Sequence, residues 1–142
     1  MRSPRVFTVT SLLAMLAGAG ATRAQDAGAA PSATVGEVVF LGESHEVAPT
    51  QIAEAMQRRI APIRQCYARA LPGTPTLAGE MQVDVTYGRN GRVTAVTATG
   101  LGSVPAVSQC VAGVVRGIAF PRLRPREAQS LRFLVPVAFR RG

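Results

Sequence analysis

The chain has 142 residues and a formal net charge of +8, and all 16 of its basic residues are arginine. Two tyrosines, no tryptophan and no interleaving of basic with aromatic residues argue against a nucleic-acid-binding surface. A conventional zinc centre takes about four ligands, and the chain offers only two cysteines and one histidine. Composition therefore argues against a nucleic-acid-binding surface and against a conventional four-ligand zinc centre before any motif is considered.

The first 24 residues have the three-part layout of a secretory signal peptide. Arg2 and Arg5 precede an apolar run over residues 6–16, and small residues follow. Cleavage is expected after Ala24, with Ala21 as the alternative. The run is shorter than the about 20 residues that a membrane helix needs, which argues against a membrane span. An uncleaved anchor is nevertheless kept as a second alternative. We therefore expect an exported protein.

Residues 25–34 are small and polar, which predicts a flexible tether. Residues 35–142 are expected to form a single domain. Removing residues 1–24 leaves 118 residues, enough for one core, with 13 arginines against 8 acidic residues and a charge of +5. Such a charge favours anionic partners in general but specifies none.

The first predicted elements are a strand and a helix. Residues 35–43 predict a strand because β-branched and aromatic residues cluster there. Residues 48–73 have helical spacing, and Pro62 falls on the polar side, so we expect a kink at this proline rather than two separate helices. The apolar arc of this helix consists of Ile52, Met56, Ile60, Ile63, Tyr67 and Ala70.

A β-hairpin is predicted over residues 79–100, followed by a second helix over residues 104–118. In the first hairpin strand, Met81, Val83, Val85 and Tyr87 alternate with polar residues. Asn90-Gly91 is typical of a tight hairpin turn. One apolar face is expected on the second helix, made by Val107, Cys110, Val111, Val114 and Ile118.

The last predicted strand covers residues 131–139. Its inward residues are expected to be Leu131, Phe133, Val135, Val137 and Phe139. Pro136 cannot donate a hydrogen bond to a neighbouring strand, so we expect this strand at a sheet edge. The order of elements predicts an α+β fold, a small antiparallel sheet of three to four strands with two helices on one face.

Cys66 and Cys110 are the only cysteines. In a small exported domain, two cysteines most simply form a disulfide, and the C-x-x-C spacing of a redox couple is missing. A helical wheel places each cysteine on the same flank of its apolar stripe, so two antiparallel helices lying side by side permit both to face one seam. We expect an inter-helix disulfide, and two free buried thiols are the alternative.

Four segments resemble the AgmX/PglI C-terminal domain, which belongs with the TonB C-terminal-like domains common in myxobacterial envelope proteins: IRQCYARAL, GEMQVDVTYGRNGRVTAVTATG, VSQCVAGVVRGIAFP and LRFLVPVAF. The resemblance covers about residues 50–140. It implies a TonB-C-like fold in the periplasm or outer envelope of a Gram-negative bacterium. Ile118 departs from the family, which often has tryptophan at this position. The matching positions are Cys66-Tyr67 in the first helix, Gly79 to Tyr87 in the hairpin, Asn90-Gly91 at its turn, Cys110 in the second helix, Phe120-Pro121 after it and Phe139 at the end.

The resemblance implies a non-catalytic domain that binds a protein partner of the cell envelope. TonB-like domains bind partners by adding a strand to the edge formed by their last strand. The candidate partner-binding residues are then the outward side chains of that strand, Arg132, Leu134, Pro136 and Ala138. Alternatively, Pro136 only protects the edge against aggregation.

A second interpretation is electrostatic. Arg122, Arg124 and Arg126 are spaced by two in an irregular link and are candidates for binding an anionic envelope polymer or a membrane surface. No enzyme activity and no cofactor are expected, because no serine lies in a nucleophile-elbow sequence and GRNGR lacks the Lys-Ser/Thr of a phosphate loop. His45, flanked by Glu43 and Glu46, is the one remaining candidate for a metal or catalytic role.

Overall fold

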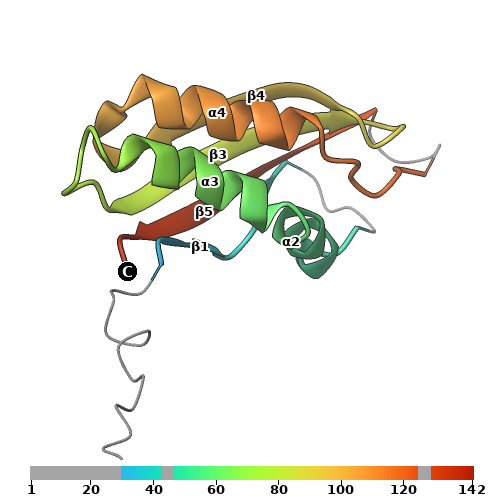
Figure 1. The fold of residues 1–142 in the computed structure, drawn as a ribbon. Helices are drawn as coiled ribbons and strands as arrows, with labels where there is room; N and C mark the ends of the chain where they lie inside the picture. Colours follow the sequence, from blue (N-terminus) through green and yellow to red (C-terminus); the bar gives the residue numbers. More distant parts are fainter. Residues whose placement is uncertain (1–29, 43–46, 125–128) are drawn as a thin grey trace, which may run out of the picture.

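The computed structural model describes residues 30–42, 47–124 and 129–142, which form one antiparallel sheet with helices on one face (Figure 1). The elements are β1 (Ser32–Val35), β2 (Val39–Leu41), α2 (Pro49–Gln57), α3 (Ile60–Ala70), β3 (Gly79–Gly88), β4 (Val93–Gly100), the short 3-10 helix η1 (Leu101–Ser103), α4 (Pro105–Arg116) and β5 (Ser130–Arg140). The strands lie in the order β1-β5-β3-β4, and β2 also pairs with β5. The α+β class is confirmed, with five strands in the described ranges instead of three or four.

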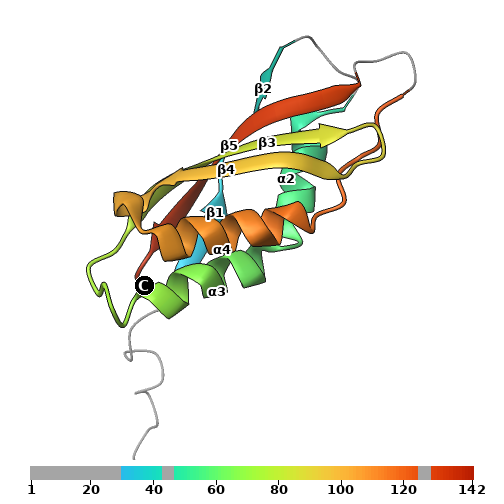
Figure 2. The same cartoon turned by 90° about the horizontal axis from the view of Figure 1, so that it is seen from above.

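The helices form a single layer over the sheet. α3 and α4 lie side by side, with α4 packed on β4 and α3 on β1 (Figures 1 and 2). α2 also contacts β1. Over the described part of the chain, the opposite face of the sheet carries no helix, so it is open (Figure 2).

The core lies between the helices and the two longest strands, as the alternation predicted. Residues of β3 and β5 that point toward the helices are almost completely buried, and the register places Val83 opposite Val135 and Val85 opposite Phe133. Burying each such side chain contributes roughly 1.5–3 kcal/mol. The buried positions are Met81, Val83, Val85, Tyr87, Leu131, Phe133, Val135, Val137 and Phe139.

Tyr67 joins the first helical region to the end of the sheet. Its ring lies 5.0 Å from that of Phe139, measured between centroids, and its hydroxyl donates a hydrogen bond to the carbonyl of Leu77. Burial raises the pKa of Tyr67, although the positive charge of Arg141 acts in the opposite direction. The phenol therefore stays protonated and can keep donating this hydrogen bond at neutral pH.

The expected kinked helix is two separate helices, so that prediction was wrong. α2 ends at Gln57 and α3 begins at Ile60, two residues before Pro62. In a continuous helix Pro62 would leave the carbonyl of Arg58 without its donor, and its ring would crowd that carbonyl. The break at Arg58 and Arg59 moves Pro62 into the first turn of α3, where a backbone N–H needs no partner within the helix.

β5 is an interior strand of the sheet, so the prediction of an edge strand was also wrong. β3 pairs along one side of it, and β1 and β2 pair along the other. The carbonyl of Pro136 accepts a hydrogen bond from the N–H of Gly36, at 2.8 Å. A residue's N–H and C=O point to the same neighbouring strand, so the missing N–H of Pro136 faces the interruption between β1 and β2. Proline is tolerated because no regular donor is required at that point.

The N-terminal boundary of the folded region also differs from the expectation. Residues 32–35 form β1 and pair with residues 137–140 of β5, so the tether predicted for residues 25–34 is wrong over its last three positions. The earlier tether residues up to 29 and the expected signal peptide lie outside the described residues. Side chains in β1 alternate between exposed and half-buried. In a sequence of small residues, this alternation is too weak to predict a strand.

The hairpin turn is held from both sides. The Asn90 side chain accepts a hydrogen bond from the N–H of Arg92, at 3.0 Å, and Gly91 has a φ of 82°. Phe120 donates its N–H to the carbonyl of Gly91, at 3.0 Å. A Cβ atom on Gly91 would lie 2.2 Å from the carbonyl oxygen of Phe120. Glycine is therefore required here by both backbone conformation and close approach.

Candidate functional site

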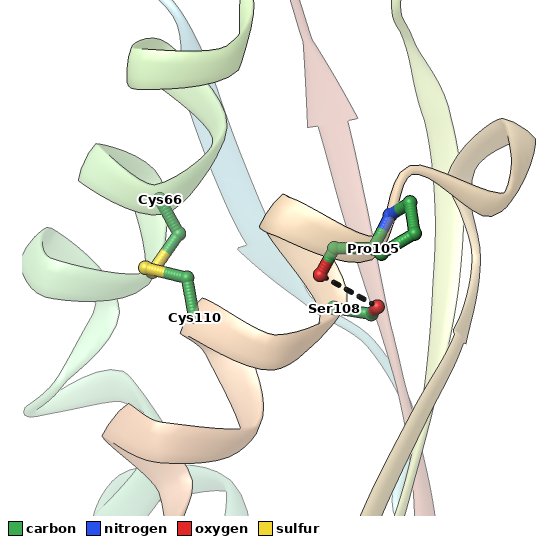
Figure 3. The surroundings of a disulfide bond; sticks show 4 residues. All are labelled: Cys66, Pro105, Ser108 and Cys110. Carbon is green, nitrogen blue, oxygen red and sulfur yellow. Dashed lines mark hydrogen bonds between the residues drawn. A yellow bond between two sulfur atoms is a disulfide. The ribbon is translucent and has the colours of Figure 1, made fainter.

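Cys66 of α3 and Cys110 of α4 form a disulfide, as expected (Figure 3). Their Cα atoms are 5.6 Å apart across 44 residues of sequence, and neither cysteine is free. Closing a loop of this length stabilises a fold by about 4 kcal/mol in the chain-entropy model. The bridge fixes the position of α4 relative to α3, and therefore relative to the sheet below.

The predicted partner-binding residues of β5 all lie on the open face of the sheet. Leu134, Pro136 and Ala138 are half-buried, and Arg132 is exposed. Their strand neighbours include Val39, which stands opposite Leu134 and is 51% exposed. Since the backbone of β5 already pairs on both sides, these residues offer side chains on a face and no free main-chain groups for strand addition.

Arg132 is held by an ion pair across the sheet. Its guanidinium donates to both carboxylate oxygens of Asp84, at 2.6 and 3.0 Å. The hydrogen bond from Arg132 holds the pKa of the Asp84 carboxyl below its usual range, with the guanidinium's positive charge adding to this effect. The same contact raises the pKa of Arg132. Arg132 is therefore engaged within the domain and is a poor anchor for a partner.

The arginines of the link after α4 are only partly described. Arg122 and Arg124 are exposed on either side of the buried Leu123, whereas Arg126 lies outside the described residues. The N–H of Leu123 donates to the carbonyl of Arg89, at 3.0 Å, which ties this link to the hairpin turn. Arg122 and Arg124 are thus exposed in a segment whose backbone is hydrogen-bonded to that of Arg89.

The open edge of the sheet is β4, which the sequence pattern did not predict. Within the described ranges, β4 pairs with β3 alone. Its sequence, VTAVTATG, has no charged residue and no proline. At its start, a single bridge between Arg92 and Ala119 covers the edge. Beyond that bridge, alternate N–H and C=O groups of β4 point away from the sheet, and no strand among the described residues pairs with them.

An open hollow of about 240 Å³ lies between β4 and α4. Cys110 and Ser108 lie on different sides of α4, so the disulfide is attached away from the hollow (Figure 3). Drug-sized ligands usually occupy pockets of about 300–1,000 Å³, so the hollow suits individual side chains better than a whole small molecule. It is lined by Val96, Thr97, Ala98, Ser108, Gln109, Ala112 and Arg116.

Only positive charge lines this hollow. Arg116 is exposed in the last turn of α4, and Arg92 is exposed just before β4. Neither guanidinium makes an ion pair with any residue that the structure describes. Asp84 belongs to the neighbouring β3, but it points to the open face and is paired with Arg132. A negative group that entered the hollow would therefore meet an unopposed arginine.

Other functional features find little further support. Among residues 30–42, 47–124 and 129–142, no three histidine, cysteine, aspartate or glutamate side chains lie close enough to hold a metal ion. Glu43, His45 and Glu46 are outside these ranges. None of the described helices is both long and apolar enough to cross a membrane.

The only sequence signal for the β4 edge was the absence of protective residues. Edge strands commonly carry lysine, proline or inward-pointing charge, and residues 93–100 carry none of these.

Comparisons with protein families, with curated proteins and with solved structures gave no match for this chain.

Proposed function

We propose that this chain is an exported, non-catalytic interaction domain of the AgmX/PglI C-terminal type that binds an extended segment of an envelope protein. The leader-like N-terminus and the disulfide support an oxidising compartment outside the cytoplasm. The order helix, hairpin, helix, strand and the two cysteines in the two helical regions support the family resemblance.

The observation that carries the proposal is the unpaired edge of β4 beside α4. A guest strand added to this edge would gain main-chain hydrogen bonds, each contributing about 0.5–1.5 kcal/mol net. Side chains of the guest on the helix side would enter the hollow lined by α4. Main-chain pairing supplies affinity, and the hollow supplies selectivity.

This proposal moves the binding edge from β5 to β4. β1 and β2 occupy the free side of β5, whereas β4 is one uninterrupted strand of eight residues. The four outward residues of β5 keep a different possible role, because a partner that contacts the open face would meet Leu134 and Val39. The two binding modes differ in whether main-chain amides become protected.

An unbiased peptide selection tests the proposal. The oxidised chain serves as bait for a display library of random peptides about ten residues long, and the most enriched peptide is then synthesised. We expect its binding to slow amide hydrogen exchange at alternate residues of β4, and to leave exchange in β1 and β2 unchanged. Strand addition at this edge is wrong if no peptide is enriched. It is also wrong if peptide binding slows amide exchange elsewhere in the domain but not in β4.

Matched lysine substitutions give a second readout. Thr97 of β4 and Thr34 of β1 are both exposed residues on outer strands. Lysine on an edge strand disfavours the addition of a further strand. We expect Thr97→Lys to weaken binding of the selected peptide roughly tenfold and Thr34→Lys to leave it unchanged. If Leu134→Glu abolishes binding and Thr97→Lys does not, docking on the open face is favoured.

A second candidate function is binding of an anionic envelope polymer or membrane surface. The observation that favours it is the placement of Arg122 and Arg124 next to the hairpin turn that carries Arg89. Vesicles with and without an anionic lipid, at low and at physiological salt, test this binding. The combined variant Arg122→Ala, Arg124→Ala, Arg126→Ala should lose it, and unchanged vesicle binding would dispose of this candidate.

A further inference from the structure

The hollow beside β4 has a direction, because its two ends differ chemically. α4 follows β4 in the chain and runs back along it, so Ser108 and Gln109 lie toward one end and Arg116 toward the other. The start of β4, where Arg92 bridges to Ala119, is the end nearer Arg116. The small residues Ala98 and Ala112 leave space in the wall, and the arginine supplies the only charge.

A guest strand would present alternate side chains to this hollow. Successive side chains of a strand point to opposite faces, so two groove-facing residues are separated by one residue. Every strand pair in this sheet is antiparallel. An antiparallel guest on β4 would therefore meet the Ala98 level first and the Val96 level, beside Arg116, two residues later.

The charge balance decides which side chain suits the second position. The described residues contain 12 arginines and 4 acidic residues, and none of the four acids lines the hollow. A carboxylate beside Arg116 would gain a charge-assisted hydrogen bond, whereas a lysine or arginine there would be repelled. At the first position, the space left by Ala98 and Ala112 accommodates an apolar side chain.

From this juxtaposition we propose that the partner is an acidic extended segment, which binds antiparallel to β4 with an apolar residue followed two positions later by aspartate or glutamate. The inference rests on the proposed strand addition and specifies its partner. The guest ends its pairing near Val93, because the segment from Ile118 to Phe120 blocks the edge beyond that point.

The test repeats the peptide selection with a variant bait. With the native chain, we expect enriched peptides to contain an apolar residue, then any residue, then an acidic residue. With Arg116→Gln, the preference for the acidic residue should disappear, whereas the control Arg140→Gln, on the far side of the sheet in the β1–β5 ladder, should keep it. Peptides capped at both ends exclude a contribution from the terminal carboxylate.

Affinity measurements by fluorescence anisotropy complete the test. Replacing the acidic residue of the selected peptide by its amide should weaken binding roughly fivefold to tenfold, with a smaller effect at high salt. The same replacement should have no effect on Arg116→Gln. If neutral or reversed peptides protect β4 amides equally well, the acidic partner is wrong and strand addition stands. If no peptide protects β4, both fail together.

Discussion

The two outer edges of the sheet are built in opposite ways. One edge is formed by two short strands, β1 with four residues and β2 with three, separated where Gly36 meets Pro136. The other edge is β4, eight residues without an interruption. α2 and α3 pack against β1, and α4 packs against β4.

The difference shows which edge is protected against further pairing. Short edge strands and local irregularities discourage the addition of another strand, and the edge made by β1 and β2 has both features. β4 is longer, and its one register shift lies near its start, where Thr86 stands opposite Ala95 and Tyr87 opposite Val93. From Ala95 to Gly100 its pairing with β3 is regular, and β4 carries no charge or proline. An open edge of this kind is an aggregation liability unless a partner covers it, which is why we place the binding function there.

The largest expected effect concerns the disulfide that fixes the β4 side of the molecule. Replacing Cys66 and Cys110 together by serine should lower the free energy of unfolding by up to about 4 kcal/mol, because the unfolded chain loses its constraint. Urea unfolding measures this loss, and reduction of the native chain should reproduce it.

Alkylation and mass spectrometry provide the control for this prediction. In protein isolated from its native cells, two alkylations should appear only after reduction. The proposed export predicts that this chain also lacks residues 1–24. Hydrogen exchange should increase in α4 more than in β1. Equal loosening of both edges would show that the disulfide does not hold the β4 side in particular.

The next effect concerns the turn at the start of β4. Gly91→Ala should lower the free energy of unfolding by about 3 kcal/mol, because a Cβ there meets the Phe120 carbonyl and the positive φ is strained for alanine. Gly113→Ala in α4 is the matched control, since nothing lies within 4 Å of the added Cβ. It should stabilise by about 0.5–1 kcal/mol through helix propensity. Thermal unfolding measures the stability of both variants. If the two substitutions change stability equally, the close approach of Gly91 to Phe120 is wrong.

The protected edge makes a prediction of intermediate size. A Cβ on Gly36 would lie 2.6 Å from Cγ of Pro136. Gly36→Ala should therefore destabilise by about 1–2 kcal/mol through overpacking. In a Pro136→Ala background the same change should cost much less, because the ring is gone. A double-mutant cycle measures this coupling, and strict additivity would mean that the two residues are not in contact.

Most of the core could be predicted from the sequence because burial leaves a strong pattern. The alternation in β3 and β5 is strict, and Met81 and Phe133 are both completely buried as expected. The disulfide followed from two cysteines on matching flanks of their helices. These features share one physical cause, which is that apolar side chains must face the same layer.

The edges could not be predicted because their signals are weak or ambiguous. Residues 32–35 are small and alternate only between exposed and half-buried, so nothing in them indicates a strand. Pro136 predicted an edge strand because proline has no N–H to donate to a neighbouring strand. An interior strand can also hold a proline where its neighbour is interrupted, because no donor is needed at that point. Pro62 predicted a kink, and the chain instead broke the helix earlier. At both prolines, the sequence shows that one backbone hydrogen bond is missing. It does not show whether the chain accommodates this loss within the same element or in a neighbouring one.

The smallest expected effect concerns the ion pair between Asp84 of β3 and Arg132 of β5, on the open face of the sheet. Asp84→Asn should lower the thermal midpoint by only about two degrees at neutral pH, since exposed ion pairs contribute little. The pKa of Asp84 is lowered below its ordinary value of 3.8 in the folded state, so the pair's contribution is present above that value and is lost as the pH falls through the lowered pKa. Midpoints of native and variant chains should differ above about pH 5 and converge in strong acid. Binding of the selected peptide should be unchanged, because Asp84 faces away from the hollow beside β4, and a loss of binding would move the site onto the open face.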